Sequence, residues 1–248
     1  MKYALELNDL SVTYKGSNFL KKAIAHLTLK IVSGEVFGFL GPNGAGKTTT
    51  IKSIFNFLPV AAGQISIFGQ DSSDYSVRSR MGYMPEIANY YWYLTPRELL
   101  RMYAGFFGFR KKTADKKIDN LLSLVGMEAE ANVLMKNFSK GMMQKISLAQ
   151  SLINDPDLLI FDEPTSGLDP LARSSVREII KGLKAKGKTI FFSSHELSEV
   201  ELVCDRIGII NKGVLVKTDK VEDIFKQKGD DMSLERYFID IIIKGDLC

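Results

Sequence analysis

The stretch Gly41-Pro42-Asn43-Gly44-Ala45-Gly46-Lys47-Thr48 decides the fold. It matches the pattern GxxxxGK[ST], in which glycines let backbone N–H groups turn inward around the phosphates of a nucleotide. In such a loop Lys47 reaches the β- and γ-phosphates, and the Thr48 hydroxyl ligates Mg²⁺. The loop and the adjacent Thr49 are therefore candidate nucleotide-binding residues, and Lys47 is also a candidate catalytic residue.

The flanks of this loop have the arrangement that the motif requires. The apolar run at 36–40 predicts a buried strand before the loop, and residues 48–57 predict a helix after it. That helix would aim its positive end at the phosphates. Alternating segments at 3–7 and 24–31 predict strands on either side of the polar residues Ser17 and Asn18.

The rest of the chain divides into a helical middle and a second half rich in strands. Thr95-Pro96-Arg97-Glu98 combines an N-cap, a proline at the first helical position and a capping-box glutamate. We expect helices at 95–108, 115–125, 139–153, 172–186 and 196–203, and strands at 65–68, 81–84, 158–161, 189–193 and 207–210. The last three strands alternate with helices, which is typical of a buried parallel sheet. Residues 237–243 fit either a helix or a strand.

Leu158-Leu159-Ile160-Phe161-Asp162-Glu163 is an apolar run that ends in two acids. A strand of this kind places the acids at the carboxyl edge of the sheet, where the glycine-rich loop also lies. Asp162 is the candidate Mg²⁺ ligand, and Glu163 is the candidate residue that orients and polarises the attacking water. The alternative is a solvated pair of acids at a turn, but the nearby phosphate loop favours the catalytic interpretation.

Bulk properties exclude several classes of protein. The 248 residues carry a net charge of +4 with no run of five or six like charges, so nothing predicts direct binding of nucleic acid. Two distant cysteines, Cys204 and Cys248, indicate a reducing compartment. The N-terminus does not resemble a signal peptide, and no stretch of about 20 apolar residues spans a bilayer. If this protein acts in transport, we expect another chain to supply the membrane path.

Four more motifs extend the pattern. Phe138-Ser139-Lys140-Gly141-Met142 resembles the LSGGQ signature, Ser166-Gly167-Leu168-Asp169 resembles the D-loop, and Ser194-His195 resembles the switch histidine. Tyr14 stands where an aromatic residue stacks on adenine. In this order and spacing, over residues 1 to about 215, the motifs resemble those of the ABC (ATP-binding cassette) ATPases.

The resemblance implies an α/β fold, a P-loop NTPase (RecA-like) core with a mixed sheet, an antiparallel β-subdomain and a helical insert. We expect one ABC ATPase domain over 1–220, with its helical subdomain at about 87–150, and a short C-terminal tail at 221–248.

The resemblance also implies hydrolysis of ATP with Mg²⁺ in a head-to-tail dimer of this chain or of this chain with a paralogous ATPase subunit. Ser139 and Gly141 of one subunit would then bind the γ-phosphate held by the other. His195 would contact that phosphate, and Asp169 would link the two sites. Taken singly, Tyr14 also fits a half-buried strand aromatic, His195 a structural histidine and Ser139 a helix N-cap.

Two motifs depart from the common pattern. Glu86 stands where most members have a glutamine, and Lys140 and Met142 replace a glycine and a glutamine in the signature. These variants resemble the bacterial branch that exports drugs, antibiotics or polysaccharides. We keep Glu86 as a candidate catalytic residue and Mg²⁺ ligand. Our hypothesis is that Lys140 of the opposing subunit offsets its charge; the alternative is a solvated lysine.

Four aromatic residues in a row, Tyr90-Tyr91-Trp92-Tyr93, follow Glu86. The family resemblance implies that they lie where an integral membrane permease docks, at the cytoplasmic face of the cell membrane; the alternative is that they pack inside the helical insert. Other functions stay open at this point. One is a soluble ABC ATPase in an assembly complex, and another is a P-loop kinase. A guanine-specific GTPase is disfavoured, because Val214 in Asn211-Lys212-Gly213-Val214 stands where the guanine-reading carboxylate must be.

Overall fold

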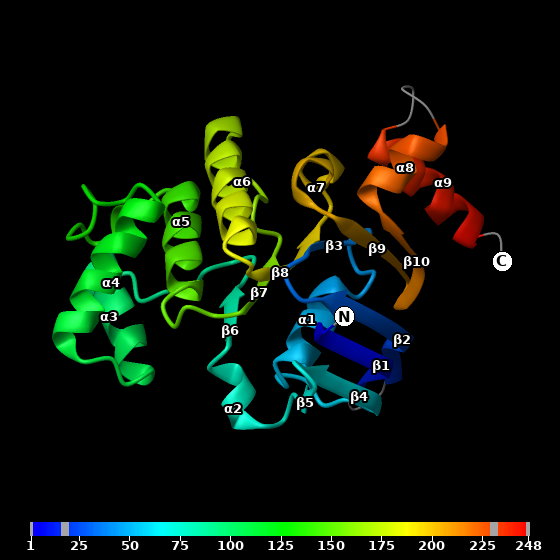
Figure 1. The fold of residues 1–248 in the computed structure, drawn as a ribbon, viewed down its shortest axis with the longest axis horizontal. Coiled ribbons are helices and arrows are strands. Elements are labelled where there is room, and N and C mark those ends of the chain that lie inside the picture. Colours follow the sequence, from blue (N-terminus) through cyan, green and yellow to red (C-terminus); the bar gives the residue numbers. More distant parts are fainter. Residues whose placement is uncertain (1, 16–19, 229–232, 247–248) are drawn as a thin grey trace.

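The computed structural model describes residues 2–15, 20–228 and 233–246. The elements form a six-stranded sheet, a four-stranded antiparallel sheet beside it and a group of helices at one end (Figure 1). Ser17, Asn18 and Cys248, which the sequence analysis singled out, lie outside the described residues. Within the described ranges, no helix combines the length and the apolar character needed to cross a bilayer.

The six-stranded sheet forms the centre of the molecule and has the order β10-β9-β3-β8-β7-β6. Its strands are β3 (Val36–Leu40), β6 (Met81–Met84), β7 (Leu158–Asp162), β8 (Thr189–Ser194), β9 (Arg206–Asn211) and β10 (Val214–Lys220). Every pair is parallel except β9 and β10. Every residue of β3, β7 and β8 is buried, so the prediction of a buried parallel sheet is confirmed.

The register of this sheet brings the sequence motifs to one edge. Leu40 at the end of β3 lies opposite Ser194 of β8, and Asp162 at the end of β7 lies opposite Ser193. The glycine-rich loop, Glu163 and His195 directly follow these strand ends, so they emerge at the same carboxyl edge.

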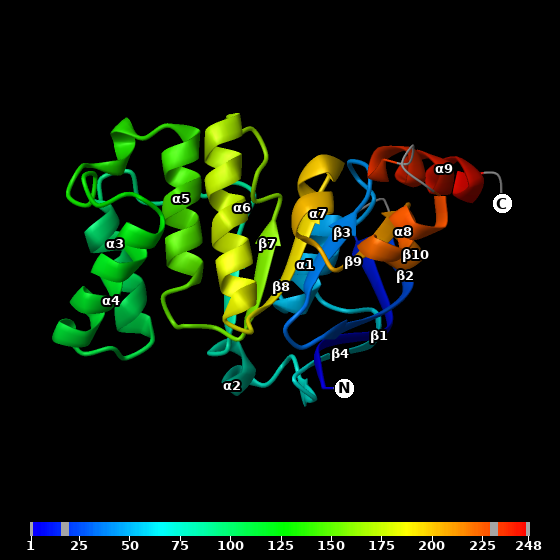
Figure 2. The same cartoon turned by 45° about the horizontal axis from the view of Figure 1, so that its top comes forward.

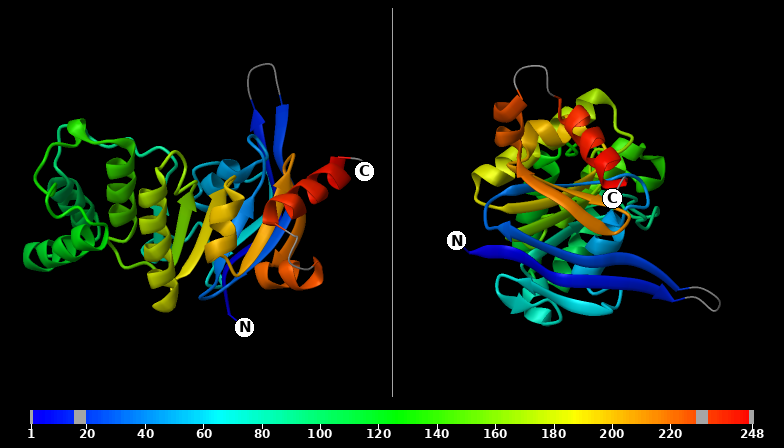
Figure 3. Two further views of the ribbon diagram at one scale, coloured as in Figure 1. Left: turned by 90° about the horizontal axis from the view of Figure 1, so that it is seen from above. Right: turned by 90° about the vertical axis from the view of Figure 1, so that its right-hand side faces the viewer.

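The antiparallel sheet has the order β2-β1-β4-β5. Its strands are β1 (Tyr3–Lys15), β2 (Leu20–Val32), β4 (Ala62–Ile67) and β5 (Gln70–Asp71). The long ribbon of β1 and β2 extends away from the rest of the molecule (Figure 3). Phe37, Phe39 and Phe191 of the central sheet share one buried cluster with this sheet and with helix α1 (Lys47–Ile54). Within this cluster the rings of Phe39 on β3 and Phe191 on β8 lie 5.3 Å apart. The cluster as a whole packs the central sheet against the antiparallel sheet.

The helical end contains α3 (Pro96–Phe106), α4 (Lys111–Leu124), the 3₁₀ turn η1 (Met135–Asn137) and α5 (Lys140–Ser151). The predicted capping box is confirmed, because Thr95 Oγ1 accepts from Glu98 N at 3.3 Å while Thr95 N donates to Glu98 Oε2 at 2.9 Å. Helix α5 runs alongside α6 (Pro170–Ala185), which covers the central sheet (Figure 2). Leu159 and Phe161 of β7 share one buried cluster with these helices, so the helical end packs directly on the sheet.

The C-terminal part packs against the sheet edge near β9 and β10. It contains α7 (Leu197–Val203), α8 (Val221–Lys228) and α9 (Leu234–Asp246). Residues 237–243, which fit either a helix or a strand, form part of α9. The Tyr237 hydroxyl donates to Asp219 of β10, and Leu234 is fully buried. The division into a domain at 1–220 and a tail at 221–248 stays a prediction.

Several elements differ from the sequence expectation. The helix expected at 48–57 ends at Ile54, because Asn56 adopts a left-handed φ of 56° that stops it. The expected strands at 3–7 and 24–31 are the centres of longer strands. The expectation omitted β5, β10, α8 and the short helix α2 (Tyr75–Arg78).

Candidate nucleotide-binding site

The glycine-rich loop leaves β3 and enters α1 through a tight turn. Ala45 N donates to Pro42 O at 3.1 Å, and Gly46, the N-cap of α1, has a φ of 115°. A Cβ at Gly46 would lie 2.6 Å from Ile24 Cδ1, so strand β2 leaves no room for a side chain. Glycine is therefore required here by both conformation and space, and α1 begins with its N–H groups open to an anion.

A cavity of about 780 Å³ lies over this loop. Its wall combines residues from β1, the loop, α1 and the ends of β6, β7 and β8. The sequence-predicted residues that line it are Tyr14, Pro42, Asn43, Gly44, Gly46, Lys47, Thr48, Thr49, Glu86, Glu163 and His195. Gly41 and Ala45 are buried in the loop, whereas Asp162, Ser139, Gly141 and Asp169 are not among the lining residues.

Glu163 is the centre of a small polar network in this cavity. Its Oε2 accepts from His195 Nδ1 at 2.7 Å and from the His195 backbone N at 3.3 Å, and its Oε1 lies 3.3 Å from Lys47 Nζ. Lys47 Nζ also donates to Gly41 O at 2.7 Å. Glu163 and Lys47 are buried, so the carboxylate is compensated by an ammonium and by a histidine. The structure therefore brings three of the candidate catalytic residues into direct contact.

Tyr14 of β1 lines the same cavity. Its hydroxyl lies 3.2 Å from Thr49 Oγ1 in the first turn of α1, and about a third of the side chain is exposed. A ring held in this way beside the phosphate loop offers an apolar face to a base.

The residues expected for Mg²⁺ have suitable chemistry. Asp162 is 2% exposed, and its Oδ1 accepts from Ser193 Oγ at 2.6 Å. Burial, together with the nearby charge of Asp162, raises the pKa of Tyr83 to about 12. Among the described residues, no group of three His, Cys, Asp or Glu side chains converges to hold a metal ion. A carboxylate and a hydroxyl together with nucleotide phosphates form the donor set that Mg²⁺ prefers, so the residues fit.

The signature and the D-loop contact one another, and Ser166 of the D-loop also lines the cavity. Ser139 is the N-cap of α5 and accepts from Met142 N at 3.3 Å, and Gln144 Nε2 donates to Pro164 O at 3.3 Å. The Lys140 side chain lies against Gly167, where a Cβ would meet its Cε at 3.3 Å. In this chain, the exposed Lys140 side chain therefore lies against its own D-loop, and both interpretations of Lys140 stay predictions.

Comparison with known proteins identifies the family. The model of the ABC transporter family matches residues 24–166, which include the glycine-rich loop, the signature and both acids. This chain belongs to the ABC transporter ATP-binding family. It is accordingly the ATP-binding and ATP-hydrolysing subunit of an ABC transporter.

Two curated relatives are named as subunits that act in transport or export. This ABC ATPase is 40% identical to the bacitracin transport ATP-binding protein BcrA of Bacillus licheniformis over 220 residues, which are 88% of this chain and 70% of the relative. It is 36% identical to a fluoroquinolones export ATP-binding protein of Mycobacterium tuberculosis over 215 residues, which are 86% of this chain and 70% of that protein.

Solved structures agree with the fold. An ATP-binding subunit of an ABC transporter has a TM-score of 0.85 and 33% identity, and the match covers 96% of this chain and 99% of that chain. A dimeric ATP-binding cassette bound to ADP and Pi has a TM-score of 0.80 at 23% identity, covering 88% of this chain and 98% of that one. The second match supports the fold alone.

Three lysines of the ABC ATPase line the nucleotide cavity and were missed by sequence reasoning. They are Lys21 and Lys22 of β2 and Lys212 of the turn between β9 and β10. Lys21 pairs across the strands with Tyr14. The proximity of Lys21 to Tyr14 depends on a strand pairing that no local motif encodes. The two adjacent lysines that follow the polar residues between the predicted strands were nevertheless a sequence signal for a basic site.

The aromatic run of the ABC ATPase is divided between the interior and the surface. The Tyr90 hydroxyl lies within hydrogen-bond distance of Ser147 Oγ at 3.1 Å and of Gln150 Oε1 at 3.2 Å, so this ring packs against α5. Tyr91, Trp92 and Tyr93 are 52%, 64% and 57% exposed. The alternative of packing inside the helical end therefore holds for Tyr90 and is wrong for the other three, which we call the aromatic surface.

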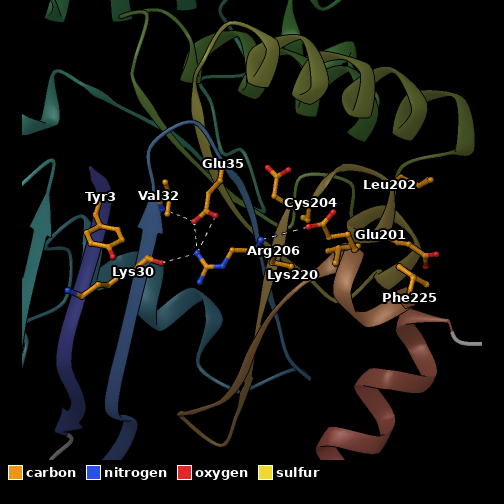
Figure 4. A pocket seen from close by; sticks show the side chains of 13 residues that line it. Tyr3, Lys30, Val32, Glu35, Glu201, Leu202, Cys204, Arg206, Lys220 and Phe225 are labelled. Atoms are coloured by element: carbon orange, nitrogen blue, oxygen red, sulfur yellow. Dashed lines mark hydrogen bonds and ion pairs between the residues drawn. The ribbon is translucent and has the colours of Figure 1, made fainter. Parts of the chain in front are cut away.

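A second cavity, of about 990 Å³, lies at the opposite edge of the sheet, where β3 and β9 begin (Figure 4). There Arg206 Nη1 donates to Glu35 Oε1 at 2.9 Å and to Lys30 O at 3.3 Å. Burial raises the pKa of Glu35, against the opposing effect of its hydrogen bonds with Val32 and Arg206. No sequence-predicted site residue lines this cavity, so it is separate from the nucleotide site.

Proposed function

We propose that this ABC ATPase hydrolyses MgATP in a composite site completed by a second ATPase subunit, and that this reaction drives export through a separate membrane permease. The proposal rests on one observation: two sets of motifs are separated within the chain. The P-loop, Glu163 and His195 line one cavity, while Ser139 and Gly141 of the signature do not line it. A second subunit in head-to-tail contact would supply the missing signature.

Within the cavity, each residue has a role that fits its position. Glu163 orients the attacking water or accepts a proton from it. Its carboxylate is held in place for this role by His195 and Lys47. Lys47 and His195 stabilise charge on the γ-phosphate, and Tyr14 stacks on adenine. Asp162, Thr48 and Glu86 would hold Mg²⁺, which neutralises phosphate charge. Asp169, whose side chain caps α6 by accepting from Ala172 N at 2.9 Å, would meet the opposing subunit.

Two inactive variants test the composite site. Lys47→Ala removes the phosphate-binding cation, and Gly141→Glu places a negative charge on the signature. A Cβ at Gly141 meets only Leu168 Cδ2 at 3.7 Å and Ser139 Oγ at 3.9 Å, so the chain accommodates this substitution. Each variant alone is expected to be inactive. An equimolar mixture should recover roughly a quarter of wild-type phosphate release, because half of the dimers are mixed and each contains one intact site. A mixture as inactive as its components would contradict the composite site.

The aromatic surface is the part of the chain that we assign to permease docking. Exposed Tyr and Trp side chains supply binding energy at interfaces because they bury a large area and keep a polar group. The segment is held in place by backbone bonds, since Lys136 N donates to Trp92 O at 2.9 Å and Met135 N donates to Leu94 O at 3.0 Å. It therefore offers a pre-organised surface.

Alanine at Tyr91 and Trp92 together is expected to weaken association with the permease by about tenfold or more while sparing ATP binding. Co-purification of the membrane subunit and a nucleotide-binding assay measure the two effects. Tyr75→Ala removes another exposed aromatic ring, on α2, and serves as the matched control. Normal recovery of the permease with the double variant would show that docking occurs elsewhere.

Export and a location at the cytoplasmic face of the membrane rest on the names of the relatives, on Glu86 and on the variant residue Lys140 of the signature. The rival function is a soluble ABC ATPase in an assembly complex. Cell fractionation separates the two, because recovery in the membrane fraction that depends on a permease supports transport, and a soluble partner complex supports the rival.

A further inference from the structure

Ser193 is a buried residue of β8 that belongs to none of the motifs described above. Its side chain has no exposed surface, and it lies directly opposite Asp162 in the parallel register of β7 and β8. The hydroxyl has two partners: Oγ donates to Asp162 Oδ1 at 2.6 Å and accepts from Glu163 N at 3.0 Å. One serine hydroxyl therefore contacts both members of the acid pair.

The chemistry fixes the direction of both bonds. A backbone N–H only donates, and an ionised carboxylate only accepts, so the single hydroxyl proton must go to Asp162 and a lone pair must receive the Glu163 N–H. Both partners are buried, which makes each bond costly to lose. With its proton on Asp162 and a lone pair on the Glu163 N–H, the hydroxyl serves both acid residues at once.

The backbone at Glu163 explains why this contact matters. Glu163 has a φ of 51°, the left-handed region that residues other than glycine rarely occupy. Such a conformation persists where surrounding contacts determine it. Ser193 fixes the N–H of Glu163, and Ser166 N donates to the Glu163 carbonyl at 3.1 Å. The turn that directs the Glu163 carboxylate toward His195 is therefore held on both sides.

We infer that Ser193 is a positioning residue for ATP hydrolysis, which sets the orientation of the Asp162 carboxylate and the turn at Glu163 through one hydroxyl. The inference rests on the proposed roles of Asp162 and Glu163. With Oδ1 engaged by Ser193, Oδ2 is the oxygen of Asp162 that remains for the Mg²⁺ shell. Ser193 itself is not among the residues that line the nucleotide cavity.

Ser193→Ala is expected to lower kcat by about 10- to 100-fold, while the KM for ATP changes by less than about twofold. A loss of this size is typical when a residue that hydrogen-bonds a metal ligand is removed. A readout independent of turnover is the Mg²⁺ concentration that half-saturates binding of a fluorescent ATP analogue, which should rise about tenfold. Ser193→Thr keeps the hydroxyl and should restore kcat to within about threefold of wild type. Ser193→Cys keeps the size with a weak donor and should resemble alanine.

Ser151→Ala is the matched control. Ser151 is equally buried, in α5, and its Oγ donates to Leu148 O at 2.7 Å, so the variant loses a hydroxyl outside the site. It should keep both kcat and the Mg²⁺ requirement. The inference is overturned if folded Ser193→Ala retains kcat within twofold, or if folded Ser193→Thr is no more active than Ser193→Ala. The proposed function fails separately, if Glu163→Gln itself continues to hydrolyse ATP.

Discussion

Glu163→Gln is expected to lower ATP turnover by about 10²- to 10⁴-fold while nucleotide binding persists. Glutamine has nearly the same size, but it lacks the carboxylate that acts on water. The contact with Lys47 at 3.3 Å also loses its charge. Steady-state phosphate release measures the first effect, and titration with a fluorescent ATP analogue measures the second.

Glu178→Gln provides the control for this substitution. Glu178 lies on the exposed face of α6 and pairs with Lys181 at 3.1 Å, so the same chemical change occurs outside the site. Its turnover should equal that of wild type. If Glu163→Gln keeps turnover within tenfold of wild type, Glu163 is not the residue that activates water in this chain.

Lys47→Ala is the second substitution with a large expected effect, and it acts on binding. Lys47 is the buried cation of the phosphate loop, and charge-assisted bonds to phosphate contribute about 1.5–3 kcal/mol each. Loss of two such bonds predicts a fall in ATP affinity of about 100-fold or more and turnover below detection. Calorimetric titration with MgATP checks this expectation.

Lys52→Ala is the matched control, because Lys52 lies on the same helix, α1, and is exposed. It should bind MgATP with wild-type affinity. Equal affinities for Lys47→Ala and wild type would place the triphosphate somewhere other than this loop.

Sequence reasoning located the core of the site because its motifs are local. A phosphate loop needs a strand before it and a helix after it within one short segment, and β3 and α1 have that form. Runs of consecutive apolar residues identified β7 and β8 for the same reason. Once these strands are parallel neighbours, Glu163 and His195 necessarily follow them to one edge.

Features that depend on contacts between distant segments were beyond sequence reasoning. Tyr90 and Trp92 are similar aromatic residues two positions apart, yet only Tyr90 finds polar partners on α5. Lys140 covers Gly167 because a left-handed glycine leaves open space beside the start of α5. Ser193 looks like one more small residue in a strand until the register with Asp162 is known.

The short apolar segment of α9 shows a different limit. Residues 237–243 contain so many apolar residues that neither the helical nor the strand periodicity is decisive. The structure settles the choice by packing, because α9 buries Leu234 and the ring of Tyr237 while leaving Ile239 and Ile243 exposed.

The central claim is that two ATPase subunits complete one another's nucleotide sites, and the mass of purified Glu163→Gln tests it most directly. Light scattering should give the single-chain mass of 27.7 kDa without nucleotide and twice that mass with saturating MgATP, because ATP that cannot be hydrolysed keeps the subunits together. A single-chain mass at saturating MgATP, with or without added permease or a paralogous ATPase subunit, would contradict the account.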